Sequence, residues 1–342
     1  MKIITEKILA KTIEIHGLEN FFKDLMKELK KDFLRWQEFK KVPRPALHVS
    51  GGVLELMPIC DNDYYSFKYV NCHPNNPDSG LMTVVATGQL CDVKTGYPLM
   101  YSEMTLLTAL RTAATTAIAT DLMARKESKI LAIVGTGAQG EFLVKALMLV
   151  RNIEEVRFYD IDPLAMNKFE ENMREAYLEL VRCKDAEMAV LGADVIITCT
   201  ACWQQAIILK DSWVKSGVHI NGVGGDSPGK TELERSILLR SKVVVEYFDQ
   251  CVIEGEIQQL GREMAEKTLH AELYELINGS KVGREKPEEI TLYDSVGIGL
   301  EDYSALKLIY NLSQKYNLGD ELEMFPMTKD PKNLISVLEG SL

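Results

Sequence analysis

The stretch Lys129-Ile-Leu-Ala-Ile-Val-Gly-Thr-Gly-Ala-Gln-Gly140 decides the fold. It reads as an apolar strand followed at once by a complete G-x-G-x-x-G motif, and an amphipathic helical pattern comes directly after it. In such a strand–turn–helix unit, Gly135 permits the tight turn, Gly137 lets the backbone approach a pyrophosphate, and Gly140 allows close packing of helix on strand. The helix N-terminus then presents free N–H groups to the anion. The motif predicts a dinucleotide site on a Rossmann-type parallel sheet; the alternative is a glycine-rich turn that holds no ligand.

An acidic residue of the kind that such a site uses ends the next predicted strand. Glu155-Val-Arg-Phe-Tyr159 is followed by Asp160, close to the expected spacing of about 20 residues beyond the glycines. A carboxylate there accepts hydrogen bonds from the adenosine ribose hydroxyls and repels a 2′-phosphate, so it favours NAD over NADP. The alternative is that Asp160 is a loop residue or caps a helix that begins at Pro163.

Apolar strands alternate with helical patterns beyond the charged stretch Arg125-Lys-Glu-Ser-Lys129, as in βαβ units. The strands are predicted near residues 130–134, 156–159, 194–199, 218–223, 242–247 and 290–294, and helices at 138–150, 163–178, 253–266 and 301–316. The chain before this stretch has a helical pattern over 18–41 and short strands between 46 and 101. A further helix is predicted to begin after Ser102 as its N-cap, with Glu103 in the first turn.

These patterns predict an α/β protein with two domains. Residues 125–316 are expected to form a doubly wound, Rossmann-type NAD-binding domain, and residues 1–124 an α+β domain with an antiparallel sheet. The tail 317–342 is expected to return to the first domain. The length of 342 residues agrees with this division, because one domain usually holds roughly 100 to 200 residues.

Charge and composition exclude several classes of function. Lys and Arg number 39 against 50 Asp and Glu, and the net charge of −11 offers little to nucleic acid or an anionic membrane. Neither a signal segment nor an apolar run of membrane-spanning length is present, so a cytoplasmic location is expected. The seven scattered cysteines are expected to be reduced. Cys199 and Cys202 form a C-x-x-C pair without a second pair at zinc-site spacing, which predicts structural thiols and no metal site.

A glycine-rich loop after the strand near 218–223 carries the first candidate for chemistry. It reads Gly224-Gly-Asp-Ser-Pro-Gly-Lys230, and Asp226 is its only carboxylate. Ligands of open parallel sheets lie at the carboxyl ends of the strands, and glycines let the backbone approach a planar ring. A lone Asp in such a loop is also common turn chemistry, and the residues alone leave both readings open.

Three cations in the first domain stand among apolar neighbours. Arg111 interrupts a small and apolar helix face, Lys68 lies within an aromatic strand, and Arg44 lies between two prolines. A buried cation costs several kcal/mol unless it is paired, so these groups are candidates for binding a carboxylate, with Glu55 as an offsetting acid. The alternative is that their long stems carry the charges out to water.

Several segments together resemble the ornithine cyclodeaminase and mu-crystallin family over nearly the whole chain. The resemblance rests on Phe33-Leu-Arg-Trp-Gln, Glu55-Leu-Met-Pro, Phe67-Lys-Tyr-Val-Asn-Cys-His-Pro, Ser102-Glu-Met-Thr, Leu110-Arg-Thr-Ala-Ala-Thr, Gly224-Gly-Asp-Ser-Pro-Gly-Lys-Thr-Glu-Leu, Ile253-Glu-Gly-Glu-Ile-Gln-Gln-Leu, Asp294-Ser-Val-Gly and Leu300-Glu-Asp-Tyr. The aspartate-containing loop and the Ile253 segment look specific to the cyclodeaminase branch. Gly140 completes a motif that the family often leaves without its third glycine.

The resemblance implies a role for each candidate residue. Arg44, Lys68 and Arg111 match the residues that bind the substrate carboxylate, and Glu55 stands beside them as a catalytic group. Asp226 matches the catalytic acid/base, and Val296 lines the substrate pocket. Cofactor contacts carry over to Thr83, Arg111, Gly135, Gly137, Ala138, Gln139, Asp160, Thr200, Asn221, Gly222, Val223, Lys230 and Ser295. The resemblance also implies a homodimer formed through the antiparallel sheet.

The implied activity is an ammonia-lyase reaction that converts L-ornithine into L-proline and ammonia. NAD would accept the Cα hydride and return it after the δ-amine has closed the ring, so that no cofactor is consumed. One rival is an NAD(P)-dependent amino-acid dehydrogenase or cyclic imine reductase, and another is a mu-crystallin-like binding protein without turnover. Asp226 and the NAD-type Asp160 disfavour the second rival. The residues do not decide between ornithine and lysine, because one methylene changes binding by only about 1 to 3 kcal/mol.

Overall fold

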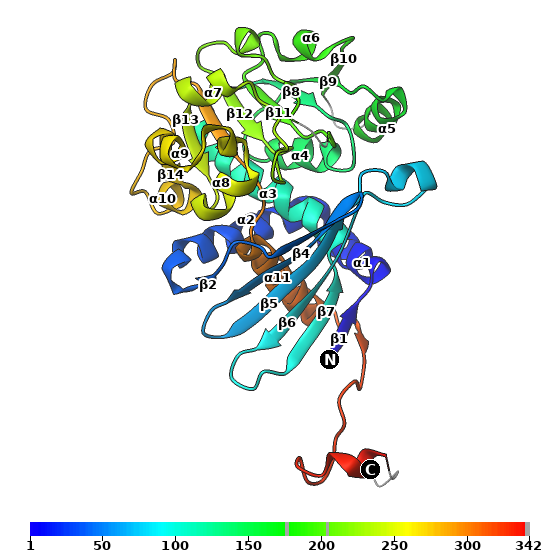
Figure 1. The fold of residues 1–342 in the computed structure, drawn as a ribbon. Coiled ribbons are helices and arrows are strands. Elements are labelled where there is room, and N and C mark those ends of the chain that lie inside the picture. Colours follow the sequence, from blue (N-terminus) through cyan, green and yellow to red (C-terminus); the bar gives the residue numbers. More distant parts are fainter. Residues whose placement is uncertain (175–177, 203–204, 339–342) are drawn as a thin grey trace.

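The computed structural model describes residues 1–174, 178–202 and 205–338, which form two sheets of eight strands each. One sheet is parallel throughout and begins with the strand before the glycine motif, and the other is mainly antiparallel (Figure 1). The fold is therefore the expected α/β fold, with a Rossmann-type sheet in one domain and an antiparallel sheet in the other.

The parallel sheet has the strand order β10-β9-β8-β11-β12-β15-β13-β14. Its strands are β8 (Ile130–Val134), β9 (Glu155–Tyr159), β10 (Glu179–Arg182), β11 (Val195–Thr198), β12 (His219–Gly222), β13 (Lys242–Val245), β14 (Leu269–Glu272) and β15 (Thr291–Asp294). The chain progresses outward in one direction from β8 to β10 and in the other from β11, so the topological switch point lies between β8 and β11. Dinucleotides bind at such a switch point, at the carboxyl ends of the strands.

All six predicted strands of this sheet are confirmed, and β10 and β14 were not predicted. Both lie at the edges of the sheet, and half of each strand is charged or histidine, so they lack the apolar run that marks a central strand. Among the helices, α4 (Gly140–Leu147) confirms the one expected after the glycines, and α5 (Pro163–Met173) ends earlier than predicted. Residues 175–177 of that prediction lie outside the described residues.

The single helix predicted over 253–266 was wrong. The segment consists of α8 (Phe248–Glu254), a 3-10 turn η4 (Glu256–Leu260) and α9 (Arg262–Thr268), with a glycine at each break. Gly255 is extended, and Gly261 has a φ of 70°, which favours glycine. In addition, the carboxylate of Asp294 accepts hydrogen bonds from the N–H groups of Glu256 and Ile257 at 2.8 and 2.9 Å, which caps the new start.

The second sheet has the order β16-β1-β7-β6-β5-β4-β2, with β3 also paired to β4. Its strands are β1 (Lys2–Ile4), β2 (Lys40–Lys41), β3 (Ala46–Val49), β4 (Gly52–Cys60), β5 (Tyr64–Cys72), β6 (Val84–Asp92), β7 (Pro98–Glu103) and β16 (Asp320–Glu321). One face is covered by α2 (Leu18–Leu34), α3 (Thr105–Met123) and α11 (Gly299–Lys315), which pack together with α1 (Glu6–His16) nearby (Figure 1). The pairing of β16 with β1 agrees with the expected return of the tail.

Helix α3 packs against both sheets, because it contacts β6 on one side and β12 and β15 on the other. Arg111 on this helix therefore lies at the junction of the two domains. The prediction of Ser102 as N-cap was wrong, since the helix begins at Thr105 and the Ser102 hydroxyl donates to the carbonyl of Glu103. The Glu103 carboxylate instead accepts from the N–H groups of Thr105 and Leu106 and satisfies the helix start.

Helix α11 follows the last strand of the parallel sheet yet packs against β4, β5, β6 and α2. We therefore propose that the first domain includes α11 as well as the tail, which moves the predicted boundary from residue 316 to the residues before Gly299. A Cβ on Gly299 would lie 3.2 Å from the carbonyl oxygen of Met57, so the first turn of α11 closely approaches β4. None of the described helices is both long and apolar enough to cross a membrane.

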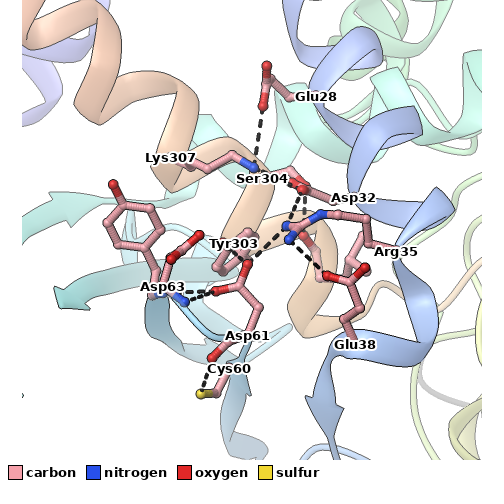
Figure 2. Close-up of polar contacts among 12 residues, drawn as sticks. Glu28, Asp32, Arg35, Glu38, Cys60, Asp61, Asp63, Tyr303, Ser304 and Lys307 are labelled. Atoms are coloured by element: carbon pink, nitrogen blue, oxygen red, sulfur yellow. Dashed lines mark hydrogen bonds and ion pairs between the residues drawn. The ribbon is translucent and has the colours of Figure 1, made fainter. Parts of the chain in front are cut away.

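A buried polar cluster fixes α11 against α2 and the turn between β4 and β5 (Figure 2). The Asp32 carboxylate accepts from Lys307 at 2.7 Å and from the Ser304 hydroxyl at 2.8 Å, both on α11. Arg35 donates to Asp32 and to Asp61, and the Tyr303 hydroxyl also donates to Asp61. These contacts hold α11 in one position, and its first turn carries two acids that reach the site described below.

Candidate active site

The glycine loop has the form that a pyrophosphate site requires. Gly135 has a φ of 103°, and a Cβ there would lie 2.6 Å from the carbonyl oxygen of Cys199, so only glycine fits the turn. A Cβ on Gly137 would meet open space, which leaves the loop accessible to a ligand. Gly140 packs against the Phe169 ring, as expected for close packing in the βαβ unit. Oε1 of Gln139 is buried without a hydrogen-bond partner in the described structure, and Ala138 beside it is exposed.

Asp160 lies against this loop. One carboxylate oxygen accepts from the N–H and hydroxyl of Thr136 at 2.6 and 3.2 Å, and the other accepts from the N–H of Asp162. The carboxylate is thereby fixed at the end of β9, next to the switch point. The helix cap that the sequence left as an alternative is Asp162, whose side chain accepts from Leu164 N. The position of Asp160 fits the ribose contact of an NAD site.

The remaining predicted cofactor residues fall into two groups. Thr200, Gly222, Val223, Lys230 and Ser295 lie at or just beyond the carboxyl ends of the parallel strands. Thr200 donates through its N–H and hydroxyl to Glu232, and Ser295 donates to Glu246. Asn221 and Thr83 form the second group, whose contacts are with other parts of the protein.

Asn221 is fully buried, and its side chain is hydrogen-bonded to Thr120 and His219. Burial lowers the pKa of His219 to about 3, so this ring is neutral. Thr83 lies just before β6 in the other domain, where its carbonyl accepts from His73 N. The contacts of these two residues are structural ones in the described chain.

Lys68 and Arg111 share one carboxylate. Nζ of Lys68 donates to Oδ1 of Asp302 at 3.0 Å, and Nε of Arg111 donates to the same oxygen at 3.1 Å. Nη1 of Arg111 also donates to Glu301 at 2.6 Å. Lys68 is only 1% exposed and Arg111 only 4%, so both charges are enclosed.

Lys68 and Arg111 face two acids of different character. Burial, followed by the charge of Glu246, raises the pKa of Glu301 well above its ordinary value and so favours its neutral form. Asp302 is shared by both cations, an arrangement that suits the binding of a further carboxylate. Burial, with the charges of Arg111 and Arg44, lowers the pKa of Lys68 from 10.5 to about 8, against the pull of Asp302.

Arg44 is held by a different pair of acids. Its Nε lies 2.7 Å from Oε2 of Glu254 and 3.2 Å from Oε1 of Glu55, and all three side chains are buried. Its Nη2 donates to the backbone carbonyl of Asp226. The first domain therefore contacts the loop after β12 through Arg44, and Arg44 is near enough to Lys68 to lower its pKa.

The Asp226 side chain is 38% exposed and is the most accessible acid of this region. Its Oδ1 accepts from Nζ of Lys230 at 2.9 Å. Burial disfavours the charge of Lys230, but the charge and hydrogen bond of Asp226, together with the charge of Glu232, raise the pKa of Lys230. Val296 is buried two residues beyond β15, and its N–H donates to Glu246. The structure thus brings together Asp226, Arg44 and Glu55 at one domain edge.

Four buried acids near the site were not predicted: Glu246, Glu254, Glu301 and Asp302. Glu246 organises the loop after β15, because it accepts from Tyr293, Ser295 and the N–H groups of residues 296 and 297. Glu301 and Asp302 occur in Leu300-Glu-Asp-Tyr, a segment whose acids resemble the first turn of a solvated helix. The signal that points to Glu254 is its place in the Ile253 segment, which holds one further acid, Glu256, and no cation.

The C-x-x-C pair consists of free thiols, and Cys199 donates to the carbonyl of Gly135 at 3.1 Å. In the part of the chain that the structure describes, acids, histidines and cysteines form no group suited to a metal ion. The described features are an open glycine loop at Gly137, a cationic pair on α3 and β5, and a set of carboxylates around Arg44.

Comparison with known proteins links this arrangement to one family. The sequence profile of the ornithine cyclodeaminase/mu-crystallin family matches residues 5–316. An ornithine cyclodeaminase from Agrobacterium fabrum is 47% identical over 322 residues, which cover 94% of this chain and 90% of that protein.

Two solved structures share the whole fold. A lysine cyclodeaminase studied with L-lysine, L-ornithine and L-2,4-diaminobutyric acid superimposes with a TM-score of 0.91 at 29% identity, covering 98% of each chain. An archaeal alanine dehydrogenase dimer with bound NAD superimposes with a TM-score of 0.87 at 33% identity, covering 95% of this chain and 99% of that one.

Proposed function

The chain belongs to the ornithine cyclodeaminase/mu-crystallin family, and on that premise we propose that it converts L-ornithine into L-proline and ammonia with NAD as a recycled cofactor. The observation that carries the proposal is the contact between the Asp226 loop of one domain and Arg44 of the other, beside the buried pair of Lys68 and Arg111. This combination supplies an accessible acid and an anion site across one domain junction.

Lys68 and Arg111 bind the α-carboxylate of the substrate. Both keep N–H groups that Asp302 and Glu301 do not occupy, and burial, which raises the pKa of Glu301, weakens the competition of that acid for the cations. Arg111 offers a planar, forked set of donors that suits a carboxylate. Fixing the carboxylate at this end orients the rest of the substrate along the junction.

The glycine loop would hold NAD, with Asp160 as acceptor for the ribose hydroxyls and the residues that follow β11, β12 and β15 as further contacts. The bound cofactor would supply reversible hydride exchange with the substrate. The open side of Gly137 and the unpaired Oε1 of Gln139 support this placement. The carboxylate of Asp160 favours NAD, because a 2′-phosphate would be repelled.

Asp226 exchanges protons with the substrate amines and with the departing ammonia. It is accessible, and Nζ of Lys230 at 2.9 Å holds its carboxylate in place, as proton exchange with a positioned substrate requires. Glu55 is the second acid at this place. Because the chain holds the carboxylate end of ornithine, ring closure by its other amine is intramolecular, an advantage worth several kcal/mol at most sites of this kind.

We also propose that the protein is a cytoplasmic homodimer formed through the antiparallel sheet. Large apolar side chains are exposed on β4, β5, β6 and β7, namely Leu56, Tyr65, Tyr69, Val85 and Tyr101. They alternate with buried residues along their strands, so they share the face of the sheet that α2, α3 and α11 leave uncovered. An apolar face of this extent is typical of a subunit interface.

The test is an assay of purified protein with L-ornithine and NAD. We expect ammonia and proline in equal amounts, and we expect Asp226→Asn to reduce the rate at least a thousandfold while the thermal unfolding temperature stays within about 2 °C. Asp249→Asn, which changes an exposed acid of α8, is the matched control. Net accumulation of NADH without proline would instead identify an amino-acid dehydrogenase, and ligand binding without ammonia release a binding protein.

A further inference from the structure

Glu254, the last residue of α8, is a buried acid that the scheme above does not use. It is 4% exposed, and its Oε2 accepts from Nε of Arg44 at 2.7 Å. Oε1 of the same carboxylate accepts no hydrogen bond from any described residue, and neither oxygen of Glu55 does, although Oε1 of Glu55 forms an ion pair with Arg44 at 3.2 Å. Two enclosed carboxylates thus share one guanidinium.

This cluster is one positive charge short. Arg44 balances only one of Glu55 and Glu254, and the nearby Asp226 is already paired with Lys230. Burial, with repulsion from Glu55 and Asp226, raises the pKa of Glu254 to about 7 despite Arg44. A cation placed beside the two acids would relieve this repulsion.

Gln250, one turn earlier on the same helix, links Glu254 to the cations Lys68 and Arg111. Oε1 of Gln250 accepts from Arg44 N at 3.3 Å, and its Nε2 donates to the carbonyl of Gly297 at 2.9 Å. Gly297 in turn lies against the guanidinium of Arg111, where a Cβ would clash. Through Gln250 and Gly297, helix α8 therefore links the cations Lys68 and Arg111 at one end of the site to the acid Glu254 at the other end.

We propose that Glu254, with Glu55, forms the subsite for the distal ammonium of the substrate and so selects diamino acids over monoamino acids. The inference rests on the proposed function, since that function sets the α-carboxylate at Lys68 and Arg111. A ligand with the same carbon chain that ends in a methyl group, without the distal amine, leaves the buried carboxylate without its donor. Sites built in this way reject the analogue that lacks the polar group far more strongly than a hydrophobic pocket rejects a methylene.

The experiment compares wild type, Glu254→Gln and the exposed control Glu263→Gln. L-ornithine is the substrate, and L-norvaline, which has a methyl group in place of the aminomethyl group, is a competitive ligand. We expect Glu254→Gln to raise the KM for ornithine at least tenfold, with a smaller change in kcat, and to leave the inhibition constant of norvaline within twofold. In wild type, kcat/KM should rise as the pH passes about 7 and Glu254 ionises, and this rise should be absent from Glu254→Gln.

Equal weakening of ornithine and norvaline would overturn the inference, because Glu254 would then act only by positioning Arg44. An unchanged KM for ornithine would overturn it as well. If Glu254→Gln does not fold, Glu254→Asp serves instead, and its shorter carboxylate should shift the ratio of kcat/KM from ornithine towards L-lysine at least fivefold. No shift in that ratio would refute the subsite.

Calorimetric binding separates this inference from the proposed function. A wild-type protein that releases no ammonia refutes the proposed function. If such a protein binds ornithine more tightly than norvaline, and Glu254→Gln or Glu254→Asp removes the preference, the subsite stands. Equal binding of the two ligands by wild type would refute the subsite too.

Discussion

Lys68 is the residue whose charge sets the pH range of substrate binding. Its pKa of about 8 lies below the ordinary 10.5, so it is charged and able to bind a carboxylate below pH 8 and becomes neutral above it. We predict that kcat/KM for ornithine falls above pH 8 and that Lys68→Arg, which stays charged, shows no such fall between pH 8 and about pH 9. Stopped assays from pH 6.5 to 9.5 measure this. If kcat/KM declined equally above pH 8 in wild type and in Lys68→Arg, the decline would not be due to Lys68.

Gly135 and Gly137 should respond differently to alanine. A Cβ at Gly135 would clash with the carbonyl of Cys199, and the φ of 103° is strained for any residue other than glycine. Gly135→Ala should therefore lower the free energy of unfolding by at least about 1 kcal/mol. Gly137→Ala meets open space, so its stability should stay unchanged while its affinity for NAD falls at least tenfold, because the Cβ occupies the approach of the pyrophosphate. Urea unfolding and NAD titration test the pair. Unchanged NAD affinity in Gly137→Ala would place the cofactor elsewhere.

Functional residues were easiest to predict from the sequence where a charged residue stands among apolar or small neighbours. Arg111 among small residues and Asp160 after a strand were found because their surroundings are unusual. Glu254, Glu301 and Asp302 were missed because acids in the last or first turn of a helix resemble a solvated face. Their burial depends on the contact of Glu254 with Arg44 and on the packing of α11 against β4 and β5. Burial of an acid depends on contacts distant in sequence, and no local pattern encodes them.

Helix α11 depends on the buried cluster in Figure 2 for its position. Asp32→Asn removes the charge that Lys307 and Arg35 share, and we predict a loss of about 2 to 4 kcal/mol in the free energy of unfolding. The loss is moderated because Lys307 keeps Glu28 and Arg35 keeps Asp61. Urea titration measures it, and Glu14→Gln, in an exposed pair with Lys11, should change stability by less than about 1 kcal/mol. A loss below that of the control would mean that the cluster does not fix α11.

Helices and strands could be predicted from the sequence where the pattern of apolar residues is strong and unbroken. The six strands predicted for the parallel sheet are present because each is a short apolar run. The break at Gly255 was not predicted, since it depends on capping by Asp294, a residue far along the chain. The domain to which α11 belongs could not be inferred from the sequence either, because the apolar face of this helix could pack against either sheet.

At the scale of the whole molecule, the exposed apolar face of the antiparallel sheet predicts a dimer. Leu56 and Tyr69 are cross-strand partners, 44% and 39% exposed, near the middle of β4 and β5. We predict that wild type sediments as a dimer and that Tyr69→Glu sediments as a monomer at micromolar concentration, because a buried unpaired charge would cost several kcal/mol. Leu164→Glu, on exposed α5 of the other domain, should remain a dimer. A dimeric Tyr69→Glu would move the interface to another surface.

In the proposed reaction, a hydride leaves the substrate Cα and returns to the ring that the same substrate forms. Ornithine labelled with deuterium at Cα, incubated with protein and a small fraction of its molar amount of NAD, tests this by mass spectrometry of the product. We expect many turnovers per NAD and proline that retains the deuterium at Cα. Unlabelled proline, or label that accumulates in free NADH, would contradict it.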